Sequence, residues 1–178
     1  MLDLLVDERK ALLNHVVTKG LNPKVNHKPS DIEWLGNIPE HWNVKPLKHI
    51  ATVSLGKMLT PDDKGGQYLK PYLRAANLTW GNVQVEDVKE MWFTEHEMKQ
   101  LRLEKFDLLL GEGGEVGRTS IWLNELPECY VQNSVHRVRC FSEFEPMFLF
   151  YLSLTYCNVG FYDSIVNRIS IAHLTRLF

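Results

Sequence analysis

The sequence is poor in cysteine and has no excess of basic charge, and both features narrow what the chain can do. Its three cysteines, Cys129, Cys140 and Cys157, are odd in number and far apart, and no C-x-x-C pair occurs. This spacing argues against a zinc site and against a disulfide framework, so we expect reduced thiols in a cytoplasmic protein. The 20 basic and 22 acidic side chains give a net charge of −2. Domains that bind nucleic acid are more often basic, so such a function would need a local basic patch.

Long apolar runs are also missing. Asp3, Asp7 and Glu8 interrupt the N-terminal apolar residues, which argues against a signal peptide. No run elsewhere is long enough to span a bilayer, so we expect no contact with a membrane. Hydrophobic residues still make up 44% of the 178-residue chain, enough for the core of one globular domain with an appendage.

The stretch from Lys105 to Trp122 has the densest local pattern in the chain. Apolar residues from Phe106 to Leu110 indicate a buried strand, and four glycines follow within seven residues. Strand-forming residues resume at Thr119, so the stretch predicts a β-hairpin with a glycine-rich turn that carries one cation, Arg118. A nucleotide-binding loop is disfavoured because that chemistry needs a helix after the glycines.

The first 20 residues predict a helix that needs a partner. Acidic residues come early and Lys19 comes late, as the helix dipole favours, and Gly20 is a natural residue to end the helix. A polar residue inside the apolar stripe is typical of coiled-coil seams. We therefore predict that the stripe contacts a helix outside the domain, with packing on the chain's own domain as the alternative. The stripe consists of Leu2, Leu5, Arg9, Leu12 and Val16.

Residues 21–43 predict a linker strapped over the surface, and residues 44–178 predict the domain proper. Three prolines exclude a long helix from the linker, while Trp34, Leu35, Ile38 and Trp42 provide apolar anchors. The domain pattern indicates an α+β fold with a mixed, mostly antiparallel sheet and short flanking helices. The expected strands cover residues 44–55, 68–73, 83–88, 106–110, 118–122 and 129–140, and the expected helices cover 95–103, 147–156 and 171–178. Thr94 and Glu97 form a capping-box pattern for the first of these helices.

Two kinds of chemistry can be assembled from the polar residues. Asp62, Asp87 and Lys89 fit a loose pattern for a Mg²⁺-dependent nuclease, in which carboxylates hold the metal. So short a pattern often arises by chance in a charged chain. Alternatively, arginine, asparagine and glutamine at loops and strand ends can hydrogen-bond to base edges in DNA. The residues that we predict to contact DNA are Lys57, Lys64, Arg74, Asn77, Arg118, Gln132, Asn133, Arg137, Arg139 and Arg168. A third possibility is a protein-interaction module without a DNA role.

An ordered series of short motifs runs through nearly the whole chain. The series resembles the specificity subunit of type I restriction-modification systems. Residues 4–21 resemble the end of that family's central conserved helix, and residues 33–42 resemble the opening of its second target recognition domain. Phe106 departs from the pattern, because the family commonly has glycine before the aspartate. The remaining matching segments are 71–77, 107–109, 112–118, 132–133, 137–139, 146–149 and 171–174.

The resemblance implies a non-catalytic, DNA-binding role. Such subunits read one half of a split double-stranded DNA target with each recognition domain, and their conserved helices form a coiled coil that docks methyltransferase subunits. S-adenosylmethionine, ATP and Mg²⁺ are then expected on the methyltransferase and restriction subunits, and no cofactor is expected on this chain. The resemblance also implies an incomplete subunit, because only one recognition domain precedes the end at Phe178. A truncated product, a half-subunit that pairs with another half, or a shortened version of the protein would each fit.

Overall fold

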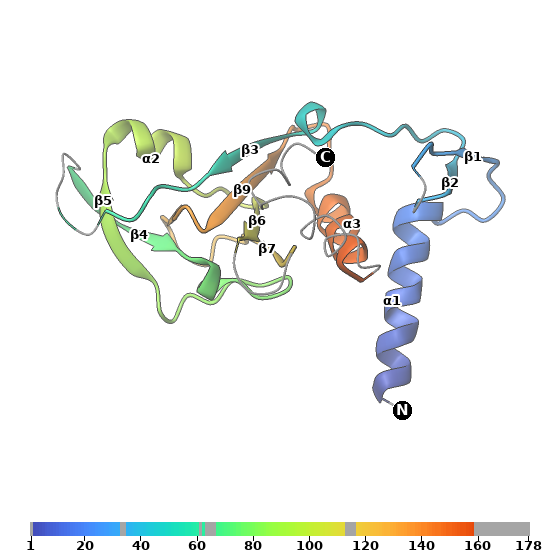
Figure 1. Ribbon diagram of the computed structural model, residues 1–178, viewed down its shortest axis with the longest axis horizontal. Coiled ribbons are helices and arrows are strands. Elements are labelled where there is room, and N and C mark those ends of the chain that lie inside the picture. The colour runs from blue at the N-terminus through green and yellow to red at the C-terminus, as the bar shows by residue number, and fades with distance from the viewer. Residues whose placement is uncertain (1, 33–34, 61, 63–66, 113–116, 159–178) are drawn as a thin grey trace.

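The computed structural model of the chain describes residues 2–32, 35–60, 62, 67–112 and 117–158 (Figure 1). The fold is α+β, with mostly antiparallel strands and an N-terminal helix at one end of the molecule (Figure 1). The sequence-based fold class is therefore confirmed. The helix predicted for 171–178 lies outside the described residues, and the division into linker and domain remains a prediction.

Helix α1 covers Leu2–Lys19, as its apolar spacing predicts. Gly20 ends it in a left-handed conformation, with φ at 79°, and its N–H donates to the carbonyl of Val16 over 3.0 Å. Glycine is favoured at such a left-handed position after a helix, because a side chain there would clash with the backbone. Within the described part of the chain, no helix is both long and apolar enough to cross a bilayer.

The segment after α1 contains a small hairpin that the sequence did not indicate. Strands β1 (His27–Pro29) and β2 (Asn37–Pro39) pair antiparallel. Both end in proline, which is compatible with the terminal position of a short strand. Ile38 is 3% exposed, and the Trp42 ring meets that of Phe148 edge-on, with 5.8 Å between the ring centroids. Two of the predicted apolar anchors thus contact the chain itself.

The central sheet has four antiparallel strands in the order β3-β9-β6-β7. The strand expected from Val44 begins only at Ala51, because a 3-10 helix covers Leu47–His49 after Pro46. The predicted glycine-rich hairpin is confirmed as the antiparallel β6-β7 pair. Its turn lies partly at residues 113–116, outside the described range. The strands cover Ala51–Leu55 (β3), Val135–Cys140 (β9), Leu108–Gly111 (β6) and Thr119–Ile121 (β7).

A second sheet has three strands in the order β5-β4-β8, of which β4 and β8 are parallel. β4 lies at the predicted position. The prediction of an extended segment at 83–88 is wrong, because the strand begins directly after this segment, at Lys89. The single strand or strand pair expected at 129–140 is instead two strands that join different sheets. The strands cover Lys89–Phe93 (β5), Tyr68–Leu73 (β4) and Tyr130–Val131 (β8).

Helices cover one face of each sheet, and a shared core fills the space between the sheets. α2 (Glu95–Leu101) packs on the three-stranded sheet through Leu101, and α3 (Pro146–Asn158) packs on the four-stranded sheet through Phe150. Between the sheets lies a cluster that includes Leu73, Leu109 and Val131. The predicted capping box is present, because the Thr94 hydroxyl accepts from the Glu97 N–H while the Thr94 N–H donates to the Glu97 carboxylate.

Phe106 has a left-handed backbone, with φ at 73°, just before β6. The sequence pattern placed Phe106 inside that strand, but its N–H instead donates to the Trp122 carbonyl over 2.7 Å, and the strand begins at Leu108. Left-handed geometry brings a side chain too close to its own backbone, at a cost of about 1–2 kcal/mol for residues other than glycine. Phe106 is also the position at which the sequence departs from glycine in the resembled family.

We predict that Phe106→Gly raises the free energy of unfolding by about 1 kcal/mol, because glycine adopts this conformation without the clash. Urea denaturation of the full chain measures the change. Phe106→Ala is the matched control, since it removes the aromatic ring but keeps the Cβ that causes the clash. An equal gain in both variants would contradict the backbone explanation and implicate the half-exposed ring.

Candidate functional site

The turn between β8 and β9 is held by backbone bonds to segments from both sheets. The N–H of Gln132 donates to the carbonyl of Leu73 at the end of β4, over 3.0 Å. The N–H of Asn133 donates to the Lys57 carbonyl over 2.8 Å, and the Lys57 N–H donates to the Val131 carbonyl over 2.9 Å. The turn therefore has a fixed position where the two sheets meet.

Gly56 permits the close approach between the end of β3 and this turn. A Cβ at Gly56 would lie 2.2 Å from the carbonyl oxygen of Gln132 and 2.5 Å from that of Val131. Both obstacles are backbone atoms, so a side chain cannot be accommodated by a rotamer change. The Gly56 N–H also donates to the carbonyl of Val135 over 3.2 Å. Glycine is thus required here because the backbone of the turn packs against its Cα, and not because the position has an unusual backbone angle.

Ser134 connects two more segments to the turn. Its hydroxyl donates to the side-chain oxygen of Gln132 over 3.0 Å and accepts from the N–H of Ala75 over 3.1 Å. Its carbonyl accepts from the N–H of Glu112 over 2.9 Å, at the end of β6. Sequence motifs far apart along the chain meet in this way. We call Lys57, Arg74, Glu112, Gln132 and Asn133 the turn cluster.

The cations of the turn cluster are held by carboxylates. The Lys57 ammonium lies 2.5 Å from a Glu97 oxygen and 5.5 Å from the centre of the Phe93 ring. Burial raises the pKa of Glu97, but hydrogen bonds from Lys57 and Thr94 outweigh it and leave the pKa below its usual value. Glu97 therefore remains ionised to lower pH than a free glutamate. It serves both as the cap of α2 and as the partner of Lys57.

Arg74 follows β4 and extends to the loop before β5. Its Nη2 donates to the Asp87 carboxylate over 2.5 Å and to the Asp87 carbonyl over 3.0 Å. Asn77 organises this loop, because its Oδ1 accepts from the Arg74 N–H while its Nδ2 donates to the carbonyls of Gln84 and Asp87. Asn77 is 3% exposed, so its predicted role in DNA contact does not fit the structure, and its role is to shape the loop.

The glycine-rich hairpin approaches the turn cluster from the side of β6. The Glu112 carboxylate lies 2.6 Å from His136 Nε2, and the Gly111 N–H donates to the Arg118 carbonyl over 3.2 Å. Arg118 is half-buried and directly precedes β7. The hairpin thus contributes Glu112 to the turn cluster, while the Arg118 backbone lies beside Gly111.

Two further arginines that we expected to contact DNA are engaged within the fold. Arg137 is 6% exposed, and it donates to the Arg102 carbonyl over 2.9 Å and to the Ser54 hydroxyl over 3.2 Å. Burial lowers the pKa of Arg137. Arg139 donates through Nε and Nη2 to the two oxygens of Asp107, at 2.7 Å each. Both arginines therefore tie β9 to the segment between α2 and β6. Burial argues against base contact for Arg137, whereas the Arg139 side chain is 29% exposed and its contact with DNA stays a prediction.

Asp107 is the buried acceptor in this arrangement, at 1% exposure. In addition to Arg139, it accepts the Glu104 N–H over 2.8 Å. A carboxylate taken out of water needs such partners, because an unpaired buried charge is strongly destabilising. This role could not be predicted from the sequence, since only the fold brings Asp107 to Arg139.

The remaining predicted residues divide between described and undescribed regions. Lys64 and Arg168 lie outside the described residues, as does the side chain of Leu2. Leu5 and Leu12 are 57% and 64% exposed, whereas Val16 is half-buried where the end of α1 packs against α3. Among the described residues, the stripe thus has an exposed outer part at Leu5 and Leu12 and a partly buried end at Val16.

The proposed nuclease triad gains no support from the fold. The Asp87 carboxylate is engaged by Arg74. The loop that contains Asp62 is attached near the far end of β5, where the Trp92 N–H donates to the Thr60 carbonyl. Trp92 is three residues beyond Lys89, about 10 Å along a strand. Among the described residues, no three His, Cys, Asp or Glu side chains gather as a metal site requires.

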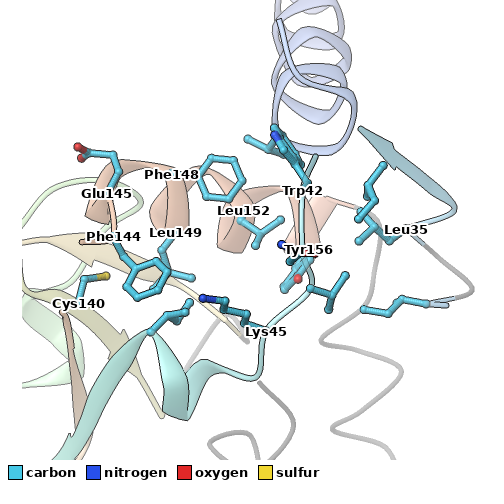
Figure 2. Close-up of a pocket in the computed structure, with 16 residues that line it drawn as sticks. Leu35, Trp42, Lys45, Cys140, Phe144, Glu145, Phe148, Leu149, Leu152 and Tyr156 are labelled. Atoms are coloured by element: carbon cyan, nitrogen blue, oxygen red, sulfur yellow. The ribbon is translucent and has the colours of Figure 1, made fainter. Parts of the chain in front are cut away.

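A cavity of about 350 Å³ lies between the end of α1, the linker and α3 (Figure 2). Its wall is mainly apolar and includes Val17, Trp42, Phe144, Phe148 and Tyr156. Figure 2 shows the labelled aromatic side chains converging on this space from the linker and α3. None of the predicted DNA contacts that the structure describes lines it. The cavity belongs to the junction between α1 and the domain, away from the convergence of polar motifs.

We predict that Gly56→Ala lowers the free energy of unfolding by about 2–3 kcal/mol, because the new Cβ forces the turn away from β3. Gly36→Ala is the control. Nothing lies within 4 Å of a Cβ there, so only the left-handed φ of 63° opposes the change, at about 1 kcal/mol. Urea denaturation compares the two. A smaller loss for Gly56→Ala than for Gly36→Ala would show that the turn is not held rigidly.

We predict that Asp107→Asn costs about 3–5 kcal/mol of unfolding free energy, because it leaves Arg139 without its buried charge partner. Glu104→Gln removes the other carboxylate, which lies 2.6 Å from the same arginine and whose side chain is 65% exposed. That loss should stay below about 1 kcal/mol, because water screens an exposed pair. Equal losses in urea denaturation would contradict the structural role of Asp107.

Comparison with known proteins identifies a fold and no sequence relative. No protein-family model and no curated protein matches the chain. A solved structure of the HsdS subunit from Thermoanaerobacter tengcongensis aligns over 89% of this chain and 36% of that subunit, with a TM-score of 0.53 and 14% sequence identity. A structure described as showing complex assembly and conformational transition of the type I R-M system aligns over 86% of this chain and 36% of its own, at 15% identity and a TM-score of 0.49. The chain thus has the fold of part of an HsdS subunit and spans about a third of the length of the chains it matches.

Proposed function

We propose that the chain is a DNA-recognition module of a type I restriction-modification specificity subunit and that it reads one half of a bipartite target. The observation that carries the proposal is the turn cluster. Segments that follow β3, β4, β6 and β8 meet there through hydrogen bonds of their backbone groups, and the last three of them carry motifs of the resembled family. The fold shared with an HsdS subunit supports the same assignment.

The positions of the described side chains reduce the set of residues that we propose for DNA contact. Gln132 and Asn133 occupy the turn itself, and both are half-buried. Amide side chains hydrogen-bond to adenine edges through paired donors and acceptors, whereas lysine and arginine bind phosphates or guanine. We therefore propose base contacts from Gln132 and Asn133, and phosphate or base contacts from Lys57, Arg74 and Arg118. Asn77 and Arg137 support this surface from within, and Arg139 remains a predicted contact.

The outer part of α1 is the proposed contact with another helix. Leu5 and Leu12 lie one heptad apart and are both more than half exposed, and Arg9 falls between them in the stripe. Coiled-coil seams use this spacing. We propose that a helix of the same assembly covers the stripe and that methyltransferase subunits dock nearby. A helix from another specificity half-subunit is the alternative source.

The proposed role is non-catalytic and cytoplasmic. Recognition requires the chain to hold DNA in register, and chemistry on the bound DNA would then belong to the methyltransferase and restriction subunits with S-adenosylmethionine, ATP and Mg²⁺. The carboxylates near the turn cluster are engaged by lysine, arginine or histidine. Their arrangement suits the positioning of cations better than metal binding.

Selection from a randomised duplex library tests the proposal. The full chain, with and without a methyltransferase subunit, is incubated with the library at 50 and 200 mM salt, and the bound DNA is sequenced. We expect enrichment of one short motif, with affinity that falls as salt rises because phosphate contacts release counterions. Enrichment only with the partner would mean that the module needs additional contacts for affinity. No enrichment from a folded protein under any condition would overturn the proposal and favour a protein-interaction role.

Asn133→Ala is the informative variant for the same assay. Its backbone N–H, which binds the Lys57 carbonyl, is unchanged by the substitution. We expect a loss of about 1–3 kcal/mol of discrimination at one base pair, with little change in binding to random DNA. Lys99→Ala on the exposed face of α2 is the control and should preserve the motif. An unchanged motif with Asn133→Ala would remove this residue from the set that reads bases.

A further inference from the structure

The ion pair between Arg74 and Asp87 differs from the other described ion pairs near the turn cluster. The Asp87 side chain is 76% exposed, whereas Glu97, the partner of Lys57, is 29% exposed. Glu97 also caps α2, so its position is required by the fold. In the described part of the chain, the Asp87 carboxylate contacts Arg74 and caps no helix. Asp87 is therefore the carboxylate that solvent or a phosphate can most readily displace.

The guanidinium of Arg74 does not depend on that carboxylate for its position. Its Nη2 also donates to the Asp87 backbone carbonyl over 3.0 Å, and the same carbonyl accepts from Asn77 Nδ2 over 3.2 Å. These bonds survive any change of side chain at residue 87. The carboxylate thus contributes mainly negative charge beside a cation that the backbone already holds.

We propose that Asp87 is a specificity-determining residue that weakens the binding of Arg74 to phosphates of arbitrary DNA. The inference rests on the proposed DNA-recognition function. A phosphate that approaches Arg74 must displace the carboxylate or remain beside a like charge, and either cost opposes sequence-independent binding. At the correct target, base contacts from the neighbouring turn offset this cost. The chain then discriminates between sequences, because only the matched sequence makes the base contacts that offset the cost of displacing Asp87.

The overall charge of the chain agrees with this role. A net charge of −2 provides little general attraction to DNA, and several basic side chains are paired with acids on the surface. Sequence-independent affinity comes almost entirely from phosphate contacts. Ion pairs that occupy the cations of a protein weaken its contacts with phosphates and so lower its affinity for arbitrary DNA. They leave the affinity that comes from base contacts largely unchanged.

The experiment compares Asp87→Asn with Glu95→Gln in the full chain. Both changes remove one negative charge, and Glu95 pairs with Lys99 on α2, 2.9 Å away and exposed. Affinities for a random-sequence duplex and for the motif selected by the library are measured between 50 and 200 mM salt. Thermal unfolding checks that both variants remain folded.

For Asp87→Asn we expect tighter binding to the random duplex and a salt slope steeper by about 0.9, the value for one added phosphate contact. The ratio of affinities at 50 and 200 mM salt then grows about 3.5-fold, and the preference for the selected motif falls. Glu95→Gln should change neither quantity to this extent. Arg74→Ala should abolish the effect, so that Asp87→Asn adds nothing in that background.

The possible failures can be distinguished from one another. If the wild type selects a motif but Asp87→Asn behaves like Glu95→Gln, the role of Asp87 is overturned and the proposed function remains. The same holds if the effect of Asp87→Asn persists when Arg74 is alanine, since the charge then acts elsewhere. If neither the wild type nor Asp87→Asn binds any duplex, both the inference and the proposed function fail.

Discussion

The backbone contacts of the β8–β9 turn are the constraint on which the arrangement of the two sheets depends. The four-stranded and three-stranded sheets share few direct strand contacts, and the turn provides bonds to the ends of β3, β4 and β6. Gly56 allows the closest of these approaches. Because buried backbone groups must find hydrogen-bond partners, displacing the turn would leave several of them unpaired at once. The candidate site therefore lies where backbone hydrogen bonds join the two sheets.

Much of the local structure was predictable from the sequence, because its causes are local. The helix that ends at Gly20, the capping box of Thr94 and Glu97, and the β6-β7 hairpin each follow from residues a few positions apart. Two local errors have local explanations. Pro46 and a 3-10 turn delay β3, and the left-handed Phe106 delays β6.

The candidate site was less predictable, because side-chain pairing depends on contacts between distant segments. The sequence suggested Lys57, Arg74, Gln132 and Asn133 as DNA contacts, and the fold brings them together. The same patterns suggested Arg137 and Arg139, which the fold directs toward Arg102 and Asp107. On β9 these two arginines alternate with His136 and Val138, so they lie on the opposite face of the strand. The sequence does not show which face of β9 is covered by other segments, so it could not separate arginines that bond within the fold from arginines that face solvent. Asp87 and Glu97 could be recognised as partners of cations only after β4, β5 and α2 were in place.

Backbone atoms hold the turn at residues 132 and 133, and this has a consequence for how the domain can change. The bonds from Gln132 to Leu73 and from Asn133 to Lys57 use main-chain N–H groups, which nearly every amino acid supplies. A replacement at either position keeps these bonds, proline excepted, while it alters the functional group presented outward. These main-chain bonds do not depend on the identity of the two side chains, and a replacement of Gln132 loses only the bond that its side-chain oxygen accepts from the Ser134 hydroxyl. Under the proposed function, single substitutions at these positions would change the target while the main-chain bonds of the turn are kept.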